Sequence, residues 1–139
     1  MEKIEKKYKL IFLIFFLAII DQLAKYLIRY FDGFYICNGG ISFGFSVPNW
    51  VFYPVVALIF IVACSYLWEK INFEDFVINK VGIAFILGGA IANLMDRYNF
   101  GCIIDFIDLK FFPVFNLADI FIMVGALLII FKRSKNENN

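Results

Sequence analysis

Residues 10–28 read LIFLIFFLAIIDQLAKYLI, a stretch that is apolar without a break as far as Ile20 and then carries Asp21, Gln22 and Lys25. A helix of about 20 apolar residues is long enough to cross a hydrocarbon layer of roughly 30 Å. Charged side chains within such a helix need a partner or a wet cavity. The stretch therefore predicts a membrane-spanning helix with a polar site near one end.

A lysine-rich N-terminus followed by an apolar run is also typical of a cleavable signal peptide. Here the run continues beyond signal length to Ile28, no small-residue cleavage site follows, and more apolar stretches come later. We therefore expect a first helix that is retained.

Three further apolar stretches cover about 51–68, 76–95 and 111–131. Of the 139 residues, 63% are hydrophobic and 20% aromatic, and the mean hydropathy is +0.82. This balance favours a bilayer as solvent. Unpaired backbone groups are too costly in lipid, and the alternation of a β-barrel is absent. We predict an all-α integral membrane protein, with residues 1–139 forming a single domain of four transmembrane helices.

The positions of lysine and arginine predict how these helices are oriented. Nine of them fall on one side of the bilayer: Lys3, Lys6, Lys7, Lys9, Lys70, Lys80, Lys132, Arg133 and Lys135. Three fall on the other side: Arg29, Arg97 and Lys110. Because the positive excess marks the cytoplasmic side, we expect both termini and the loop 69–75 in the cytoplasm. The loops 29–50 and 96–110 are expected outside.

This orientation places the intramembrane polar residues at one depth, in the outer leaflet. They come late in the first and third stretches and early in the fourth, and they are Asp21, Lys25, Asn93, Asp96, Arg97, Asn116 and Asp119. Several are spaced i,i+3 or i,i+4, so they face each other on one helix. Interhelical glue explains any one pair, whereas three helices with such groups at one depth favour a functional site.

Both outer loops predict a small β-like element on the membrane surface. The loop 29–50 contains NGGISFG at 38–44, flanked by alternating apolar residues, and the loop 96–110 contains GCIIDFID at 101–108. Alternation around a glycine turn is typical of short amphipathic strands. We expect Asp105 at the mouth of the cavity that holds the polar residues.

The three cysteines are too few and too scattered for a disulfide framework or a metal cluster. Cys37 and Cys102, in the outer loops, can pair in an oxidising compartment, but nothing in the sequence places them within bonding distance, so free thiols are expected. The chain has no histidine, which removes His-dependent triads and the usual zinc sites. We expect no metal or other cofactor, and the net charge of +1 gives no reason to expect nucleic acid.

The remaining chemistry is that of carboxylates, because no nucleophile motif surrounds any serine or cysteine. Two neighbouring aspartates can share one proton, so that one acts as a base toward water and the other as an acid toward the departing amine. Asp21 and Asp96 have a cation close by in sequence, and Asp108 lies beyond the strand-like segment. Asp105 and Asp119 lack such a cation and are the preferred pair.

Five blocks of the chain resemble lipoprotein signal peptidase (signal peptidase II), and they occur in that family's order over nearly the whole chain. The blocks are DQLAK at 21–25, NGGISFG at 38–44, GGAIANLMDR at 88–97, IDFI at 104–107 and FNLAD at 115–119. One departure is Ala92, where the family commonly has glycine. A methyl group there can crowd a helix contact, but it removes no chemical group.

The resemblance implies an intramembrane aspartic endopeptidase of the bacterial cytoplasmic (inner) membrane, with Asp105 and Asp119 as its catalytic pair. Such an enzyme removes the signal peptide from a prolipoprotein just before the diacylglyceryl-modified cysteine. The resemblance also implies contact with membrane lipid and inhibition by globomycin, and we expect a monomer. Roles in substrate binding or in supporting the site carry over to Asp21, Lys25, Asn38, Gly40, Phe43, Asn93, Asp96, Arg97, Asn116 and Ala118.

The residues alone leave two alternatives open. A small proton- or ion-coupled transporter would use the intramembrane Asp and Lys residues as a relay and needs a polar path across the whole bilayer. The inner halves of the four stretches carry almost no polar side chain, which speaks against it. A non-catalytic membrane scaffold would use the same residues as interhelical glue.

Overall fold

The structure is a computed structural model that describes residues 2–39 and 77–137. In chain order its elements are α1 (Glu2–Tyr30), β1 (Ile36–Asn38), α3 (Val77–Phe100), β2 (Ile103–Asp105) and α4 (Leu117–Glu137). All of them belong to one compact unit. The apolar stretch at 51–68 and the predicted site residues Gly40 and Phe43 lie outside the described residues.

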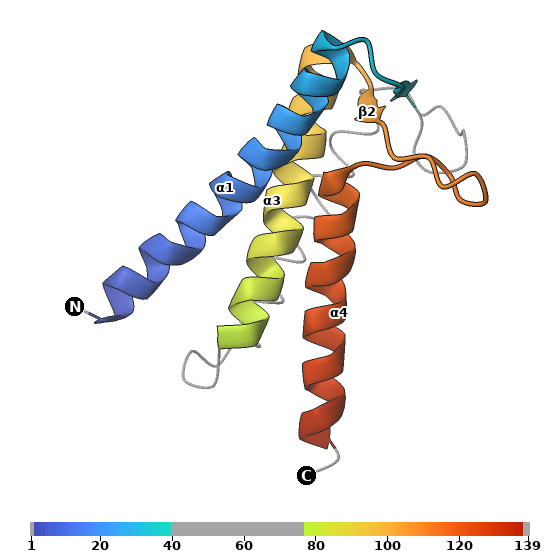
Figure 1. Cartoon of the computed structure of the whole chain (residues 1–139). Helices are drawn as coiled ribbons and strands as arrows, with labels where there is room; N and C mark the ends of the chain where they lie inside the picture. The colour runs from blue at the N-terminus through green and yellow to red at the C-terminus, as the bar shows by residue number, and fades with distance from the viewer. Residues whose placement is uncertain (1, 40–76, 138–139) are drawn as a thin grey trace. The chain divides into compact units, whose positions relative to one another are not determined.

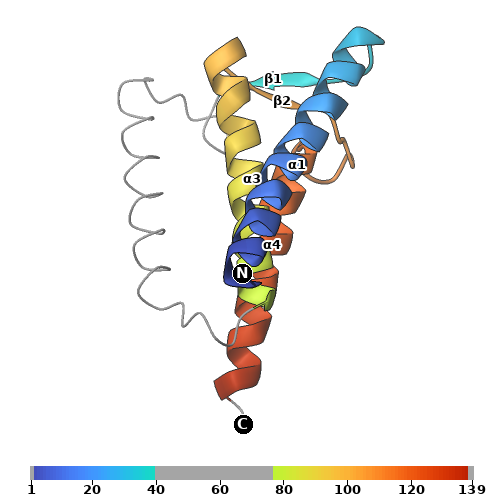
Figure 2. The same ribbon diagram turned by 90° about the vertical axis from the view of Figure 1, so that its left-hand side faces the viewer.

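Within this unit, α1 and α3 run in the same direction and α4 runs back (Figure 1). The last turns of α1 and α3 and the two strands therefore lie at one end, and α4 begins on the same side, partway along the other two helices (Figures 1 and 2). This agrees with the prediction that residues late in the first and third stretches lie beside residues early in the fourth.

Glycines on α3 let it approach both neighbouring helices closely. A Cβ at Gly88 would lie 2.9 Å from a backbone oxygen of α1, and a Cβ at Gly89 would collide with the carbonyl oxygen of Ala118 in α4. Further along the same two helices, a Cβ at Gly82 would lie 2.8 Å from the carbonyl oxygen of Gly125. Such small residues are typical of helix contacts in membranes.

The start of α4 differs from the prediction, because the helix begins at Leu117 rather than at Phe111. The side chain of Asn116 accepts a hydrogen bond from the Asp119 N–H (3.0 Å), and the Asp119 side chain accepts one from the Asn116 N–H (3.2 Å). This reciprocal arrangement is a capping box, which fixes the first turn of a helix. Pro113 disfavours helix in the residue before it, so the apolar residues upstream stay non-helical.

α3 continues past its predicted end at Met95 to Phe100, and Gly101 terminates it. Gly101 has a positive φ of 73° and donates its N–H to the Arg97 carbonyl at 3.0 Å, as a glycine that closes a helix does. The chain then turns directly into β2.

β1 and β2 form an antiparallel two-stranded sheet in which Ile36 faces Asp105 and Asn38 faces Ile103. The predicted small surface element is therefore confirmed. It spans the space between the upper ends of α1 and α3 (Figure 2).

The expectation of free thiols at Cys37 and Cys102 was wrong, because the two residues form a disulfide with Cα atoms 5.5 Å apart. The strand register brings the two cysteines close together. Cys37 faces Ile104, which is only two residues after Cys102. The two cysteines are 65 residues apart in sequence, so only the pairing of the two loops brings them together.

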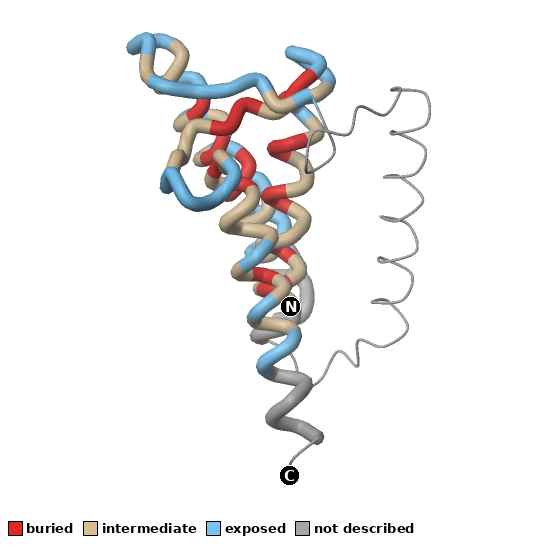
Figure 3. The backbone as a smooth tube through the Cα atoms, turned by 90° about the vertical axis from the view of Figure 1, so that its right-hand side faces the viewer, coloured by how far each residue is buried: buried red, intermediate tan, exposed pale blue. Residues whose placement is uncertain are grey.

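The distribution of buried residues differs from that in a typical water-soluble protein. The largest fully buried side chains are polar: Lys25, Asn116, Asp21 and Asp96. Large apolar side chains on the same helices are exposed, among them Phe12 (69%), Ile19 (62%) and Phe131 (68%). Figure 3 shows that many of the buried residues gather in the half nearest the sheet. Lipid favours this pattern, because it solvates apolar side chains and leaves charged groups to pair inside.

One helical stretch among the described residues, Tyr8–Tyr30, is long and apolar enough to cross a membrane, with a mean hydropathy of 2.1. A shorter apolar helical stretch covers Leu117–Phe131.

Candidate active site

Lys25 lies at the centre of a buried polar cluster. Its Nζ lies 2.6 Å from Oδ2 of Asp21 and 2.7 Å from Oδ2 of Asp96, and it donates to Oδ1 of Asn93 at 3.1 Å. Two carboxylates and one amide oxygen, from α1 and α3, therefore surround the ammonium group. Because the cluster is fully buried, removal of one partner would leave a charge uncompensated in a low-dielectric environment.

The two carboxylates that pair with Lys25 each accept a further hydrogen bond from the backbone of another element. Oδ1 of Asp21 accepts the N–H of Ala118 at 2.8 Å, and Oδ2 of Asp96 accepts the N–H of Ile104 at 3.0 Å. These donors are the residues directly before the two aspartates that were predicted as the catalytic pair. One lysine therefore holds the backbone at both positions.

Three asparagines hold the carboxyl groups of this predicted pair. Nδ2 of Asn38 donates to Oδ2 of Asp105 at 3.0 Å, and Nδ2 of Asn116 donates to Oδ1 of Asp105 at 2.6 Å. Nδ2 of Asn93 donates to Oδ1 of Asp119 at 2.9 Å. Since Asn116 also donates to Asn93 at 3.1 Å, the two carboxyl groups are linked through two side-chain amides.

Asp105 is only 2% exposed, so it lies inside the cluster rather than at the mouth of a cavity as expected. Burial raises the pKa of the Asp105 carboxyl, and the nearby Asp119 carboxyl raises it further, although hydrogen bonds from Asn38 and Asn116 lower it. Asp119 is half-buried at the first turn of α4.

Asp108 differs from this pair, as predicted. Its Oδ2 lies 2.5 Å from Nζ of Lys110, whose side chain is 84% exposed. The side-chain hydrogen bond from Lys110 holds the pKa of Asp108 below its usual value. A solvated ion pair of this kind is suited to the protein surface.

The structure brings together most of the residues that the sequence singled out: Asp21, Lys25, Asn38, Asn93, Asp96, Asp105, Asn116, Ala118 and Asp119. Arg97 lies on α3 beside Asp96 and is half-buried. Asp96 was expected to be held by that neighbour, and it forms an ion pair with Lys25 of α1. Within residues 2–39 and 77–137, no group of three or more His, Cys, Asp or Glu side chains is placed to hold a metal ion.

Gln22 was not among the predicted site residues, although its side chain belongs to the cluster. Nε2 of Gln22 donates to Oδ1 of Asp96 at 2.7 Å and to the carbonyl oxygen of Ala92 at 3.1 Å. The available signal was a polar residue beside Asp21, close to the end of the apolar run. Ala92 itself is fully buried and packs with Ala18 and Ala118, so its methyl group fills a helix contact.

The family model for signal peptidase II matches residues 13–134. The chain belongs to the signal peptidase II family. This confirms the resemblance that the five sequence blocks indicated. Within this signal peptidase II family member, the matched residues include every described residue of the polar cluster.

Relatives named lipoprotein signal peptidase are similar over most of their length. The one from Caldanaerobacter subterraneus subsp. tengcongensis is 36% identical over 134 residues, which cover 86% of this chain and 91% of the relative. The one from Moorella thermoacetica is 38% identical over 128 residues, which cover 79% and 82%. A solved bacterial membrane enzyme shares the fold with a TM-score of 0.77 at 27% identity, over 93% of this chain and 89% of the other.

Proposed function

We propose that this protein is an intramembrane aspartic endopeptidase that removes the signal peptide from prolipoproteins, just before the diacylglyceryl-modified cysteine. The linked carboxyl groups of Asp105 and Asp119 carry this proposal, because Asn116 and Asn93 connect them in a buried cluster. The names of the relatives support lipoprotein signal peptides as the substrate class.

The two aspartates supply general base and general acid catalysis. The ionised carboxyl takes a proton from water while the water oxygen bonds to the carbonyl carbon of the scissile peptide. The protonated carboxyl donates its proton to the carbonyl oxygen. The carboxyl that took the proton from water then gives it to the nitrogen, and the C–N bond breaks as the amine leaves. The first carboxyl recovers its proton from the hydroxyl as the carboxylic acid product forms. The raised pKa of Asp105 supports assigning the shared proton to Asp105 before attack. Asp119 is then the base.

The proposed setting is the outer leaflet of the bacterial cytoplasmic membrane, with both termini in the cytoplasm. In this proposal residues 1–139 form a monomeric four-span domain whose second span is 51–68. The exposed apolar side chains and the buried charges support a lipid environment. A polar cluster at one end of the helices suits a peptide bond at the membrane surface, where the acyl chains of the substrate remain in lipid. Globomycin is the expected inhibitor.

The arrangement of polar residues supports a peptidase over a transporter. Among the described residues, the buried polar side chains are Asp21, Lys25, Asn93, Asp96, Asp105 and Asn116. They lie at the end of the unit that carries the sheet, whereas a relay needs polar groups along the whole path.

Cleavage of a lipid-modified prolipoprotein by purified Asp105→Asn and Asp119→Asn variants tests the proposal. Each variant keeps the side-chain size but cannot act as a base or share a proton, so we expect turnover to fall about 10³-fold or more. Asp108→Asn is the matched control, because it changes a nearby aspartate outside the cluster, and it should keep wild-type turnover. Wild-type turnover in either cluster variant would refute the assignment.

A further inference from the structure

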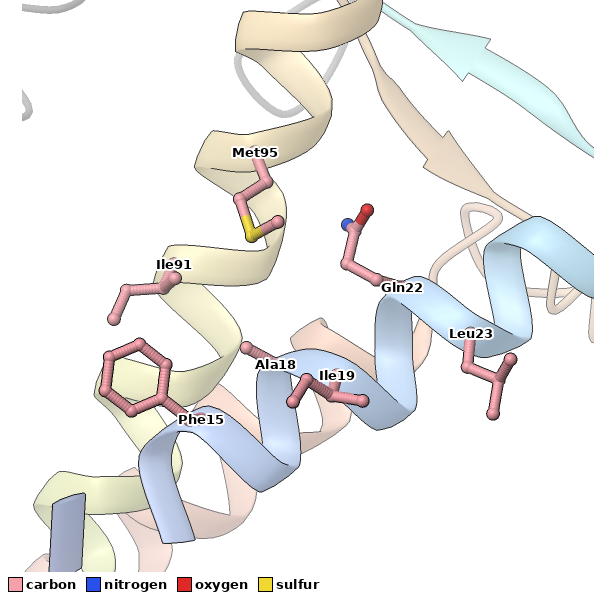
Figure 4. A pocket seen from close by; sticks show the side chains of 7 residues that line it. All are labelled: Phe15, Ala18, Ile19, Gln22, Leu23, Ile91 and Met95. Carbon is pink, nitrogen blue, oxygen red and sulfur yellow. The ribbon is translucent and has the colours of Figure 1, made fainter. Parts of the chain in front are cut away.

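Gln22 lines a groove of about 440 Å³ between α1 and α3 (Figure 4). The other side chains that line this groove are apolar, among them Leu23 and Met95. Figure 4 shows the amide of Gln22 directed across the gap toward α3. The side chain of Leu23, at the next position of α1, is directed away from α3.

Both hydrogen bonds of the Gln22 amide end on α3. One goes to the carbonyl oxygen of Ala92 at 3.1 Å and the other to Oδ1 of Asp96 at 2.7 Å. The second oxygen of Asp96 takes the contacts with Lys25 and with the N–H of Ile104. Donors therefore reach both oxygens of this carboxylate, and Gln22 supplies the one on the side away from Lys25.

A carboxylate that is held at one oxygen only can rotate about the bond to its Cβ atom. A donor on the other oxygen fixes the plane of the group, so Gln22 determines where Oδ2 of Asp96 points. That oxygen holds the N–H of Ile104, the residue before Asp105. A displacement of Asp96 is therefore passed to the backbone of β2.

We propose that Gln22 is a positioning residue for the reaction: it orients Asp96, and Asp96 in turn places Asp105 through the Ile104 N–H. This inference rests on the proposed function, because it takes Asp105 as a catalytic residue. A displacement of about 1 Å at a reacting group can cost on the order of 10²-fold in rate. The effect of losing Gln22 should therefore appear in kcat.

Two other roles for Gln22 predict different results. If the amide only joins two helices, its loss lowers the melting temperature and leaves kcat unchanged. If the groove binds substrate through this side chain, its loss raises KM. The positioning role predicts a lower kcat with KM nearly constant.

The first test compares Gln22→Leu with Leu23→Ala in cleavage of a lipid-modified prolipoprotein. Leucine has a similar volume but cannot donate, so Gln22→Leu should lower kcat about 10- to 100-fold and change KM less than about 2-fold. Leu23→Ala changes the same groove without touching a hydrogen bond, so its kcat should equal that of the wild type. Equal losses of kcat in both variants would overturn the proposal, as would a change in KM alone.

The second test uses Gln22→Glu and the pH dependence of kcat relative to the wild type. Among the described residues, Asp96 on α3 contacts Gln22 directly, Lys25 on α1 pairs with Asp96, and Asp21 on α1 pairs with Lys25. At low pH the introduced carboxyl group is protonated and can donate to Asp96, whereas at high pH two carboxylates face each other. The kcat ratio of Gln22→Glu to wild type should therefore fall as pH rises, while the ratio for Gln22→Leu stays flat.

A flat ratio for Gln22→Glu would overturn the positioning role. The dyad variants separate the two hypotheses. Turnover by Asp105→Asn would refute the proposed function itself. Inactive dyad variants together with wild-type kcat in Gln22→Leu would refute only the role of Gln22.

Discussion

The backbone N–H of Ala118 donates a hydrogen bond to Oδ1 of Asp21 at 2.8 Å, which ties the first turn of α4 to α1. The bond from the N–H of Ile104 to Asp96 ties β2 to α3 in the same way. Both carboxylates pair with Lys25. A single ammonium group thus holds the chain on either side of the proposed catalytic centre.

Lys25→Met should destabilise the protein and abolish cleavage. The variant keeps most of the side-chain volume but leaves Asp21 and Asp96 as buried carboxylates without a cation, which costs about 3–5 kcal/mol. Thermal unfolding in detergent and the cleavage assay measure both effects. Lys110→Met is the control, because the Lys110 side chain is exposed, and it should leave the melting temperature unchanged. A wild-type melting temperature in Lys25→Met would contradict the central role of the lysine.

Gly89→Ala should reduce activity more than Gly82→Ala does. Both substitutions introduce a methyl group against a backbone oxygen of α4, and overpacking of this kind costs about 1–3 kcal/mol. At Gly89 the clash is with the carbonyl of Ala118, so the displaced turn is the one that carries Asp119. Melting temperatures and kcat of the two variants, measured side by side, test this. Equal loss of kcat at equal loss of stability would show that the contact at Gly89 has no special effect on the site.

Reduction of the Cys37–Cys102 disulfide should lower kcat several-fold. The bond fixes β1 against the start of β2, and β1 carries Asn38, which donates to Asp105. Without the bond, this donor is held only by the short sheet. The comparison is between reduced and oxidised protein in a Cys64→Ser background, with thiol content determined by mass spectrometry.

A double variant, Cys37→Ser with Cys102→Ser, provides the control for the disulfide prediction. Its kcat should match that of the reduced protein and should not respond to reductant. If oxidised and reduced proteins cleave at the same rate, the disulfide does not position Asn38.

The stability of the protein should depend on pH through Asp105, whose pKa is raised above its ordinary value of 3.8. Between these two values the folded state binds more protons than the unfolded state, so stability falls as pH rises through this window. Asp105→Asn removes that dependence. The melting temperature of the variant minus that of the wild type should therefore be larger at neutral pH than at a pH near the ordinary value of 3.8.

Asp108→Asn should give the opposite trend, since the pKa of Asp108 is lowered and its stabilising effect is present above the ordinary pKa. The trend should be weak, because solvent screens this exposed pair. A rising difference in melting temperature for Asp105→Asn together with a flat or falling one for Asp108→Asn supports the assignment. The same slope in both variants would contradict it.

Hydropathy and residue spacing predicted much of this architecture. They located the helices α1, α3 and α4, and they predicted that the polar residues of these helices lie at one end. The ion pair of Asp21 with Lys25 followed from i,i+4 spacing alone. These features depend on local periodicity, which a sequence carries directly.

Features that depend on the rotation of one helix against another were not predicted. Asp96 pairs with Lys25 across a helix interface, although Arg97 is closer in sequence. The role of Gln22 has the same origin, since its partners lie 70 and 74 positions away. The start of α4 was missed for a different reason, because a capping box at Asn116 and Asp119 leaves no mark on hydropathy.

The disulfide can also form only late in the assembly of the protein. It joins a residue just after α1 to one just after α3, so it can close only after the chain has been synthesised past Cys102 and the ends of both helices have met. Non-reducing electrophoresis of pulse-labelled chains would then separate nascent, unassembled molecules from those in which the two strands have paired. The disulfide therefore marks the chains in which the two strands have already paired.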